Sequence, residues 1–159
     1  MARAGFYTVE SGKISFRRDG NWYSDEERID NPRISLLFSQ SIKQNPDGSY
    51  YLQVAEERAP ITIEDTPYVV QALEDDELGG FAMVLNDRTR EPLDPAMLEV
   101  GADNVLYAKV KGGAHRARFL RTAYYHLSER FESDDAGRFF VNIRGRRHPL
   151  AVARGGNRS

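Results

Sequence analysis

Three arginines fall within one short segment, and their side chains are the best suited in this chain to bind a ligand: Arg116, Arg118 and Arg121. A guanidinium group presents a planar fork of N–H donors, which matches the geometry of a carboxylate or a phosphate. Tyr124 follows three residues after Arg121 and would add an aromatic wall to such a site. These four residues predict a binding site for a small anionic ligand.

The same segment carries a helical pattern of apolar residues, which predicts a helix over residues 114–131 that begins after the glycines at 112–113. The pattern has steps of four, three and four: Leu120, Tyr124, Leu127 and Phe131. On this helix Arg116 would lie ~40° from Leu120, on the apolar side, where an unpaired charge costs several kcal/mol. Its partner is therefore either an acid from residues 54–103 or an external anion, and the sequence leaves both open.

Two neighbouring acids, Glu64 and Asp65, precede Thr66 and are the carboxylate candidates. Asp65 can accept a hydrogen bond from its own downstream backbone and so stabilise a turn. The alternative is a carboxylate exposed in a cleft, with Glu57, Glu64 or Asp65 as the acid or base and Arg121 stabilising an anion. That alternative would make the protein a carboxylate-based enzyme of unknown reaction.

Motifs of familiar catalytic mechanisms are missing from the sequence. The glycine pairs at 79–80 and 112–113 lack the Lys-Ser/Thr of a phosphate-binding loop, and no HExxH, GxSxG or EF-hand motif is present. The chain has no cysteine, which excludes disulfides and thiolate metal sites. His115 and His126 would lie ~16 Å apart on the predicted helix, too far for one metal ion. We therefore expect no catalytic residue, no metal and no cofactor, and a binding module rather than an enzyme.

The net charge of -2 conceals an uneven distribution along the chain. Residues 54–103 carry three basic and thirteen acidic side chains, whereas residues 104–159 carry twelve basic and four acidic ones. Such an asymmetry indicates either attraction between two surfaces of one fold or a basic face for a partner. Nucleic-acid binding by this basic final third, through Phe139, Phe140 and the arginines of 138–158, is a second alternative. The overall pI of about 5.9 disfavours nucleic acid as a partner.

Alternating apolar and polar residues dominate the remainder of the chain and predict about nine short strands. Their ranges are 13–17, 21–23, 49–54, 61–64, 67–73, 80–86, 106–110, 139–143 and 149–152. A first helix begins at Asn31-Pro32, with the asparagine as its cap, and ends at residues 45–48. No internal repeat is predicted. The fold class is therefore α+β, mostly antiparallel β with a roll or barrel-like sheet and two helices, the longer one near the C-terminus.

The expected organisation is a small α+β lobe over residues 12–66 and an antiparallel β-roll lobe over residues 67–152, which contains the helix 114–131. The two lobes are expected to form one compact unit, with flexible ends at residues 1–11 and 153–159. No stretch approaches the ~18 apolar residues of a membrane span, and the first residues lack the apolar core of a signal peptide. We therefore expect a cytoplasmic protein with no membrane contact. Unpaired strand edges in such a roll would suit a homodimer.

Three short runs, taken in order, connect the chain to a known family: Asp47–Leu52 (DGSYYL), Ile63–Val69 (IEDTPYV) and Arg121–Tyr125 (RTAYY). Over residues 13–152 the chain resembles the bacterial family called domain of unknown function 1285 (DUF1285). The resemblance implies a small α+β lobe that leads into a roll of antiparallel strands with one long helix, and it implies no activity. Together with the arginine segment, it leads us to expect a non-enzymatic binding or regulatory module for a small anionic ligand or a protein partner.

Overall fold

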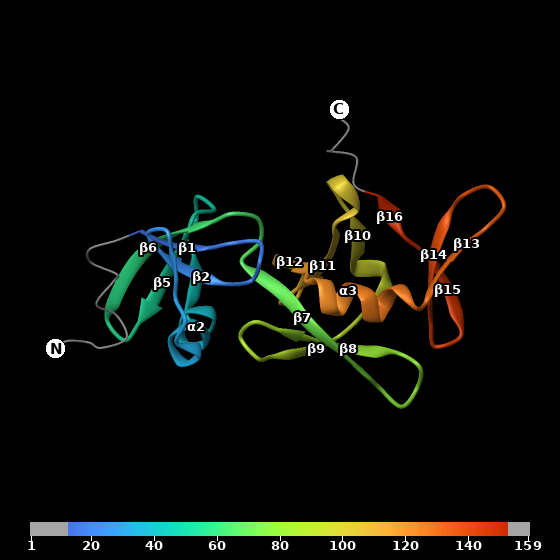
Figure 1. Ribbon diagram of the computed structural model, residues 1–159, viewed down its shortest axis with the longest axis horizontal. Coiled ribbons are helices and arrows are strands. Elements are labelled where there is room, and N and C mark those ends of the chain that lie inside the picture. Colours follow the sequence, from blue (N-terminus) through green and yellow to red (C-terminus); the bar gives the residue numbers. More distant parts are fainter. Residues whose placement is uncertain (1–12, 153–159) are drawn as a thin grey trace. The chain divides into compact units, whose positions relative to one another are not determined.

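The computed structural model describes residues 13–152, and the chain divides into two units, residues 1–68 and residues 69–159 (Figure 1). The predicted flexible ends, residues 1–11 and 153–159, lie outside the described residues. The described part of each unit consists mostly of strands and contains one α-helix of eight residues. No helix in the described part of the chain is long and apolar enough to cross a membrane.

The first unit is a six-stranded sheet with one helix packed on it. The sheet has the order β3-β2-β1-β6-β5-β4, and its neighbours are antiparallel except β1 and β6, which are parallel. Its elements are β1 (Ile14–Phe16), β2 (Trp22–Ser24), β3 (Glu27–Arg28), α2 (Pro32–Ser39), β4 (Ile42–Gln44), β5 (Tyr50–Val54) and β6 (Glu57–Ile63). The alternation predicted for residues 13–17 is present, because Ile14 and Phe16 are buried and Ser15 between them is not.

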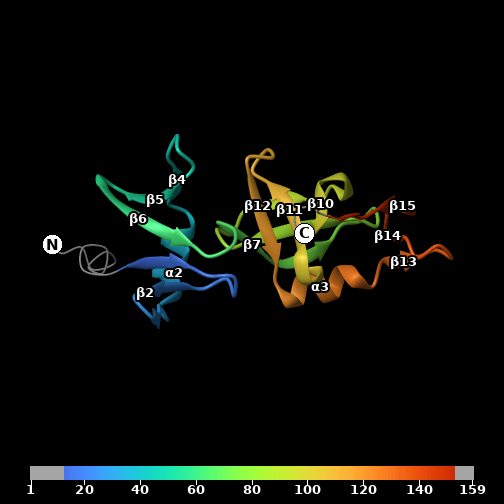
Figure 2. The ribbon, with the colours of Figure 1, turned by 90° about the horizontal axis from the view of Figure 1, so that it is seen from above.

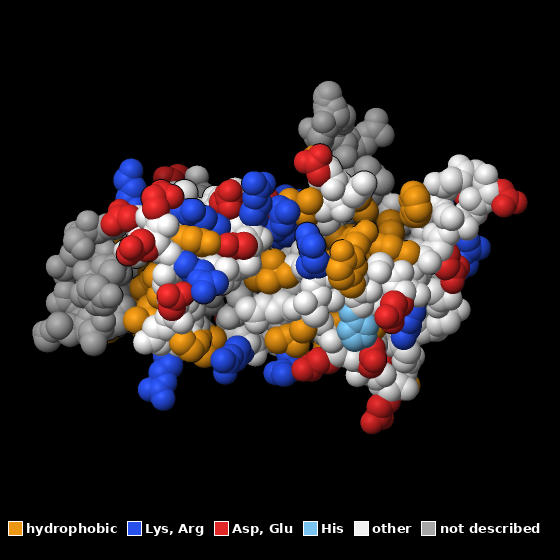
Figure 3. Space-filling model, viewed as in Figure 1, with side chains coloured by type: hydrophobic (Ala, Val, Ile, Leu, Met, Phe, Trp, Pro, Cys, Tyr) orange, Lys and Arg blue, Asp and Glu red, His pale blue; other side chains and the backbone are white. Residues whose placement is uncertain are grey.

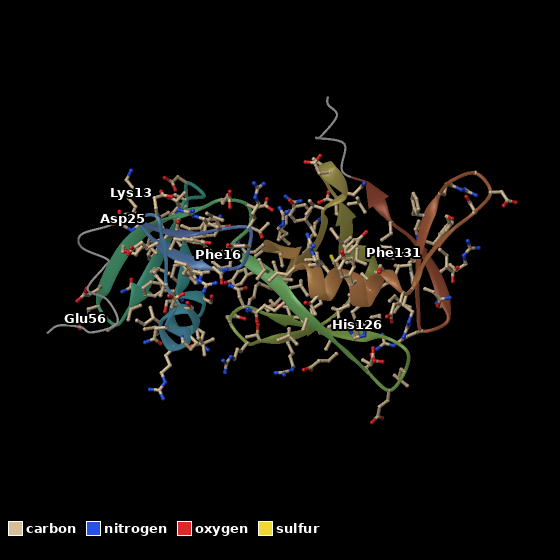
Figure 4. The ribbon with its side chains drawn as sticks, in the orientation of Figure 1. Lys13, Phe16, Asp25, Glu56, His126 and Phe131 are labelled. Carbon is tan, nitrogen blue, oxygen red and sulfur yellow. The ribbon has the colours of Figure 1, made fainter. Side chains whose placement is uncertain are left out.

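The core of the first unit is built around Trp22. The Trp22 ring lies 4.8 Å from the ring of Phe16 and 5.5 Å from that of Phe38, which belongs to α2. Its indole N–H donates a hydrogen bond of 2.9 Å to Ser39 Oγ at the end of the same helix. Phe16, labelled in Figure 4, is fully buried in this unit. These contacts hold α2 against the sheet.

Helix α2 begins as predicted but ends earlier. Asn31 caps it by accepting a hydrogen bond from the backbone of its first turn at 2.9 Å. The predicted end at residues 45–48 is wrong, because the helix stops at Ser39 and those residues are the turn between β4 and β5. The physical reason is a hydrogen bond of 3.0 Å from Gln53 N to Ser41 O, which draws the chain after the helix into the sheet.

The second unit contains a seven-stranded sheet that curls into a half-barrel and a separate three-stranded sheet (Figure 2). The large sheet has the order β16-β10-β11-β12-β7-β8-β9, and the small one has the order β13-β14-β15. The elements are β7 (Tyr68–Asp75), β8 (Phe81–Leu85), β9 (Arg90–Pro92), β10 (Leu98–Val100), β11 (Leu106–Val110), β12 (His115–Phe119), α3 (Arg121–Ser128), β13 (Phe131–Ser133), β14 (Phe139–Ile143), β15 (Arg146–Pro149) and β16 (Ala151–Val152). Two short 3₁₀ turns, Pro95–Met97 and Ala102–Asn104, flank β10.

Pairing in the second unit is antiparallel between β7 and β8, β8 and β9, β10 and β11, and β11 and β12, and parallel between β10 and β16. The predicted fold class, α+β with mostly antiparallel strands and a roll-like sheet, is confirmed. One detail of it is wrong: neither described α-helix is the longer, because both have eight residues.

The helix predicted over residues 114–131 is wrong in its first half. That part is strand β12, and the helix itself is confined to Arg121–Ser128. Gly112 and Gly113 have φ of +70° and +88°, a conformation that glycine adopts without strain, and they turn the chain back along β11. The residues after the turn alternate between buried and more exposed positions, as a strand with one covered face does.

A helix followed by three antiparallel strands occurs twice, which corrects the prediction that the chain has no internal repeat. The first repeat comprises α2, β4, β5 and the first part of β6, and the second comprises α3, β13, β14 and β15. Each element of the second repeat begins 89 residues after its counterpart: Pro32 and Arg121, Ile42 and Phe131, Tyr50 and Phe139, Glu57 and Arg146. The two segments therefore correspond residue by residue, without insertions.

Each repeat also forms an equivalent backbone hydrogen bond in the turn between its first two strands. Asn45 N donates to Ser49 O at 2.7 Å in the first repeat, and its counterpart Asp134 N donates to Arg138 O at 3.0 Å in the second. Identical residues are few: Ser39 and Ser128, Gly48 and Gly137, Arg58 and Arg147, Pro60 and Pro149. The repeat is thus carried by burial pattern and turn geometry, which many sequences can supply, and a comparison of residue letters does not show it.

Candidate functional site

The predicted arginines are positioned by the strands β10, β11 and β12. Tyr107 is paired across the strands with both Glu99 and Arg118, and Lys109 is paired with Arg116. Residues paired across antiparallel strands point to the same side of a sheet, and neighbours along a strand point to opposite sides. Glu99, Tyr107, Lys109, Arg116 and Arg118 therefore share one side of the sheet, which we call the basic face.

Arg116 is held in place on the basic face by two neighbours. Its Cζ lies 4.0 Å from the centroid of the Tyr107 ring, and its Nη2 lies 3.3 Å from Glu99 Oε1. Gly101 leaves room for that ring, since a Cβ there would lie 2.8 Å from Tyr107 Cε2. A guanidinium stacked on a tyrosine gains about 0.5–2 kcal/mol and still presents the N–H groups at its edge. The stack therefore orients an arginine fork before any ligand arrives.

Positive charge exceeds negative charge on the basic face. Lys109 and Arg116 are exposed and Arg118 is half-buried, whereas Glu99 is the carboxylate that the strand pairing places beside them. Figure 3 shows Lys and Arg side chains over the part of the second unit that Figure 1 labels β11 and β12. The two exposed cations, Lys109 and Arg116, beside one carboxylate produce a positive potential, which favours an anionic ligand.

Arg121 and Tyr124, the other residues of the predicted group, lie on α3 rather than on the sheet. Arg121 is the first residue of the helix; it is exposed and makes no ion pair with a residue that the structure describes. Tyr124 is half-buried, and its ring lies 5.9 Å from that of Phe131, labelled in Figure 4 where α3 leads into the small sheet. For Arg116, the internal partner that the sequence left open is Glu99, an acid within the range 54–103.

The predicted carboxylates lie in the first unit. Glu64 is exposed, accepts a hydrogen bond of 2.9 Å from Arg18 N, and has its Oε2 3.7 Å from Arg18 Nε. Asp65 is half-buried and precedes Thr66, whose hydroxyl donates to Tyr68 O at 2.6 Å. Glu64 thus links the loop after β1 to the end of β6, which is a structural role.

A polar cluster that the sequence analysis missed joins two turns of the second unit, and we call it the Asp87–Lys111 cluster. Lys111 Nζ donates to Asp87 Oδ2 at 2.6 Å and to Thr89 Oγ1 at 3.0 Å. The hydroxyl and the backbone N–H of Thr89 donate to Asp87 Oδ1, at 2.6 and 3.0 Å. The Asp-x-Thr spacing of such a turn is visible in the sequence, but its lysine partner lies 24 residues away.

The chemistry of this cluster is structural. Burial alone raises the pKa of Asp87, but the hydrogen bonds from Lys111 and Thr89 outweigh burial and hold the pKa below the ordinary 3.8. The Thr89 hydroxyl donates its proton to Asp87, a carboxylate that its lowered pKa makes a weak base, and it accepts from Lys111, so this arrangement does not activate the hydroxyl as a nucleophile. Burial, with a smaller contribution from the charge of Lys111, lowers the pKa of His115.

The three histidines lie on different elements: His115 on β12, His126 on α3 and His148 on β15. His126, labelled in Figure 4, has its Nε2 3.1 Å from Asp75 Oδ1. Within residues 13–152, no group of three or more His, Asp or Glu side chains is placed so as to hold a metal ion.

Comparisons with known proteins show a family match for the first unit and a likeness in fold for the chain. Residues 8–66 match the family model described as domain of unknown function (DUF1285), N-terminal domain. A DUF1285 family protein from Silicibacter pomeroyi DSS-3 is similar in structure, with 19% identity and a TM-score of 0.69, over 99% of this chain and 100% of that one. A DUF1285 family protein from Shewanella baltica OS155 is similar with 18% identity and a TM-score of 0.60, over 77% of this chain and 95% of that one. A comparison with curated proteins finds no match.

Residues 8–66 therefore form the N-terminal domain of the DUF1285 family, as the sequence resemblance predicted, and the similar solved structures show the fold of the chain. The matched family model covers most of the first unit, and the similar solved structures extend the likeness in fold into the second. The family description names no activity, so a function has to be argued from the geometry of the site.

Proposed function

We propose that the protein is a non-enzymatic binding module that holds a small anionic ligand on the basic face of its second unit. One observation carries the proposal. The guanidinium of Arg116 is stacked at 4.0 Å on Tyr107, directly opposite Lys109 in the strand register and two residues from Arg118 on the same face.

The ligand that suits this face carries a carboxylate or a phosphate. Such a group accepts two parallel N–H bonds from one guanidinium, and a neighbouring ammonium adds a third contact. Glu99 occupies one edge of Arg116 at 3.3 Å and would compete with the ligand for it. Two net charge-assisted hydrogen bonds of about 1.5–3 kcal/mol each correspond to dissociation constants near the millimolar range for a simple anion. A larger metabolite would gain affinity from further contacts.

The test is a titration of ¹⁵N-labelled protein with inorganic phosphate and with citrate, followed by NMR chemical shifts. We expect saturable shifts in the amides of β10, β11 and β12, and a dissociation constant raised ~10-fold by Arg116→Gln or Arg118→Gln. Arg138→Gln is the matched control, because Arg138 is an exposed arginine of the same unit that is paired with Asp134 at 2.7 Å. Shifts that fall outside these strands, or an equal effect of all three variants, would overturn the proposal.

Two other functions were open from the sequence, and each makes a different prediction for the same titration. Carboxylate-based catalysis would require Glu57, Glu64 or Asp65, so replacing these acids, as in Glu64→Gln, should change the response to the anions. Nucleic-acid binding would require the basic final third, so a single-stranded oligonucleotide should bind with a steep loss of affinity on adding salt. The proposal on the basic face expects neither result.

A further inference from the structure

The two repeats carry the same exposed stack of an arginine on an aromatic ring. In the first repeat, Arg58 Cζ lies 4.0 Å from the centroid of the Tyr51 ring. In the second, Arg147 Cζ lies 4.3 Å from the centroid of Phe140. The arginines are counterparts, and so are the rings, because β5 and β14 begin at corresponding residues, as do β6 and β15.

In the second repeat, a carboxylate of the chain itself neutralises the stacked arginine. Glu132, on β13, has its Oε1 3.0 Å from Arg147 Nε. Its other oxygen accepts a hydrogen bond of 3.1 Å from Asn142 Nδ2. Glu132 is paired with Phe140 in the strand register, so it stands beside the ring on which the arginine is stacked.

In the first repeat, a lysine stands where the second repeat has this glutamate. Lys43 on β4 is the counterpart of Glu132, and it is paired with Tyr51 as Glu132 is with Phe140. Lys43 and Arg58 are both exposed, and neither makes an ion pair with a residue in the described range 13–152. Two cations therefore lie on the face that carries Tyr51: Arg58 stacked on its ring and Lys43 paired with it in the register, where the second repeat has a glutamate.

The polar side chain directly opposite Arg58 in the register does not supply the missing charge. Gln53, the counterpart of Asn142, donates from Nε2 to the backbone oxygens of Ala55 at 2.8 Å and Glu57 at 3.3 Å. Its amide nitrogen is thus used within the hairpin, and it brings no negative charge. Lys43 and Arg58 are the two side chains that would contact an added carboxylate.

We propose that Lys43, Arg58 and Tyr51 form a docking site for an acidic peptide segment of a partner protein, with a Glu or Asp side chain of the peptide in the place that Glu132 takes in the second repeat. Strand β4, which carries Lys43, is the terminal strand of its sheet (Figure 2). An extended peptide that pairs with such an edge gains main-chain hydrogen bonds, and its alternate side chains lie over the sheet face beside Lys43.

A peptide fits these observations better than a free small molecule or a second copy of the chain. The site adjoins the edge strand β4, where an extended peptide gains main-chain hydrogen bonds that a free small molecule does not make. Three of the four acids in the chain's own acidic run at the β7–β8 turn are already paired: Glu74 with Arg90, Asp75 with His126, and Asp76 with Arg144. The site lies in the first unit and is independent of the basic face.

The substitution Lys43→Glu is the sharpest test, because it gives the first repeat the charge arrangement of the second. We expect this variant to fold at least as stably as the natural protein, since Arg58 gains an internal partner. The probe is a fluorescein-labelled Thr-Glu-Thr-Glu-Thr-Glu peptide in a fluorescence polarisation assay at low salt. Binding to Lys43→Glu should be at least ~10-fold weaker, the equivalent of one charge-assisted contact of about 1.4 kcal/mol.

Matched controls test three points separately: whether binding depends on the charge of the site, on its location in the first repeat, and on the charge of the peptide. Arg147→Gln, the same change in the neutralised second repeat, should leave peptide binding unchanged, whereas Arg58→Gln should weaken it. The same peptide with Gln in place of Glu should bind at least ~10-fold more weakly. NMR shifts on the labelled protein should appear in β4, β5 and β6. The proposal is overturned by equal binding to the Lys43→Glu variant, by equal binding of the Gln peptide, or by inorganic phosphate shifting the amides of β4, β5 and β6 as the peptide does.

Discussion

Replacing Asp87 by asparagine is expected to destabilise the second unit by about 2–4 kcal/mol, because it leaves the ammonium of Lys111 in a poorly solvated place without its anion. The Asp87 side chain is 8% exposed and that of Lys111 is 24% exposed, and their atoms are 2.6 Å apart. Breaking a fully buried pair costs about 3–5 kcal/mol, and a fully exposed pair contributes about 0–1 kcal/mol. Because the lysine is partly exposed, the expected free-energy cost lies between these two values and closer to that of a fully buried pair.

Lys111→Met removes the other charge and should cost a similar amount. Methionine keeps the length of the side chain, and both residues pay the same penalty for the positive φ of 58° at this position. The double variant Asp87→Asn, Lys111→Met should be less destabilised than the sum of the single variants, with a coupling energy of about 1–3 kcal/mol.

Urea unfolding followed by far-ultraviolet circular dichroism is the appropriate assay. The single tryptophan, Trp22, lies in the first unit, so its fluorescence does not report directly on the cluster. The folded-state pKa of Asp87 lies below the ordinary 3.8, so the stability that its charge contributes is present above about pH 4 and is lost as the pH falls through the folded-state value. Single variants that cost less than about 0.5 kcal/mol, or costs that add without coupling, would refute this reasoning.

Two further predictions concern buried groups, one in each unit. Ser39→Ala leaves the indole N–H of the buried Trp22 without its 2.9 Å acceptor and should cost about 1–3 kcal/mol in urea unfolding followed by Trp22 fluorescence. Its counterpart Ser128→Ala, at a half-buried serine that donates to Tyr125 O, is the control, and an equal loss in both would contradict the argument. Because burial, and then the charge of Lys111, lower the pKa of His115 below 6.5, its neutral form contributes stability that is present above pH 6.5 and lost below it. His115→Gln should therefore lose less stability than the natural protein between pH 7.5 and pH 5.5, and an NMR titration midpoint at or above 6.5 for this ring would contradict the prediction.

Local structure was predictable wherever the deciding residues are neighbours in the sequence. Asn31 caps α2 as predicted, because a cap depends on a few adjacent side chains and backbone angles. The alternation of Ile14 and Phe16 similarly indicated a strand with one buried face.

The prediction of a helix over 114–131 was wrong because the spacing of the apolar residues changes from a strand period to a helical period at Leu120. The true helical spacing begins at Arg121, and the residues before it alternate with a period of two, which the longer pattern obscured. Pairing with β11 satisfies the backbone of that segment in extended form, and the glycine turn makes the pairing possible. The choice between strand and helix was therefore made by a neighbour in space.

The same distinction, between what neighbours in the sequence decide and what neighbours in space decide, applies to the candidate sites. The sequence by itself determined that arginines cluster between residues 116 and 121, that the chain lacks cysteine, and that its charge is uneven. Only the tertiary structure decided that Glu99 faces Arg116, that Lys111 reaches Asp87, and that Lys43 lies on the same sheet face as Arg58, where the second repeat has a carboxylate. The physical reason is that a charged side chain takes its partner from the register of the strands around it, and register is set by the burial of the whole sheet rather than by the residues next to it in the chain.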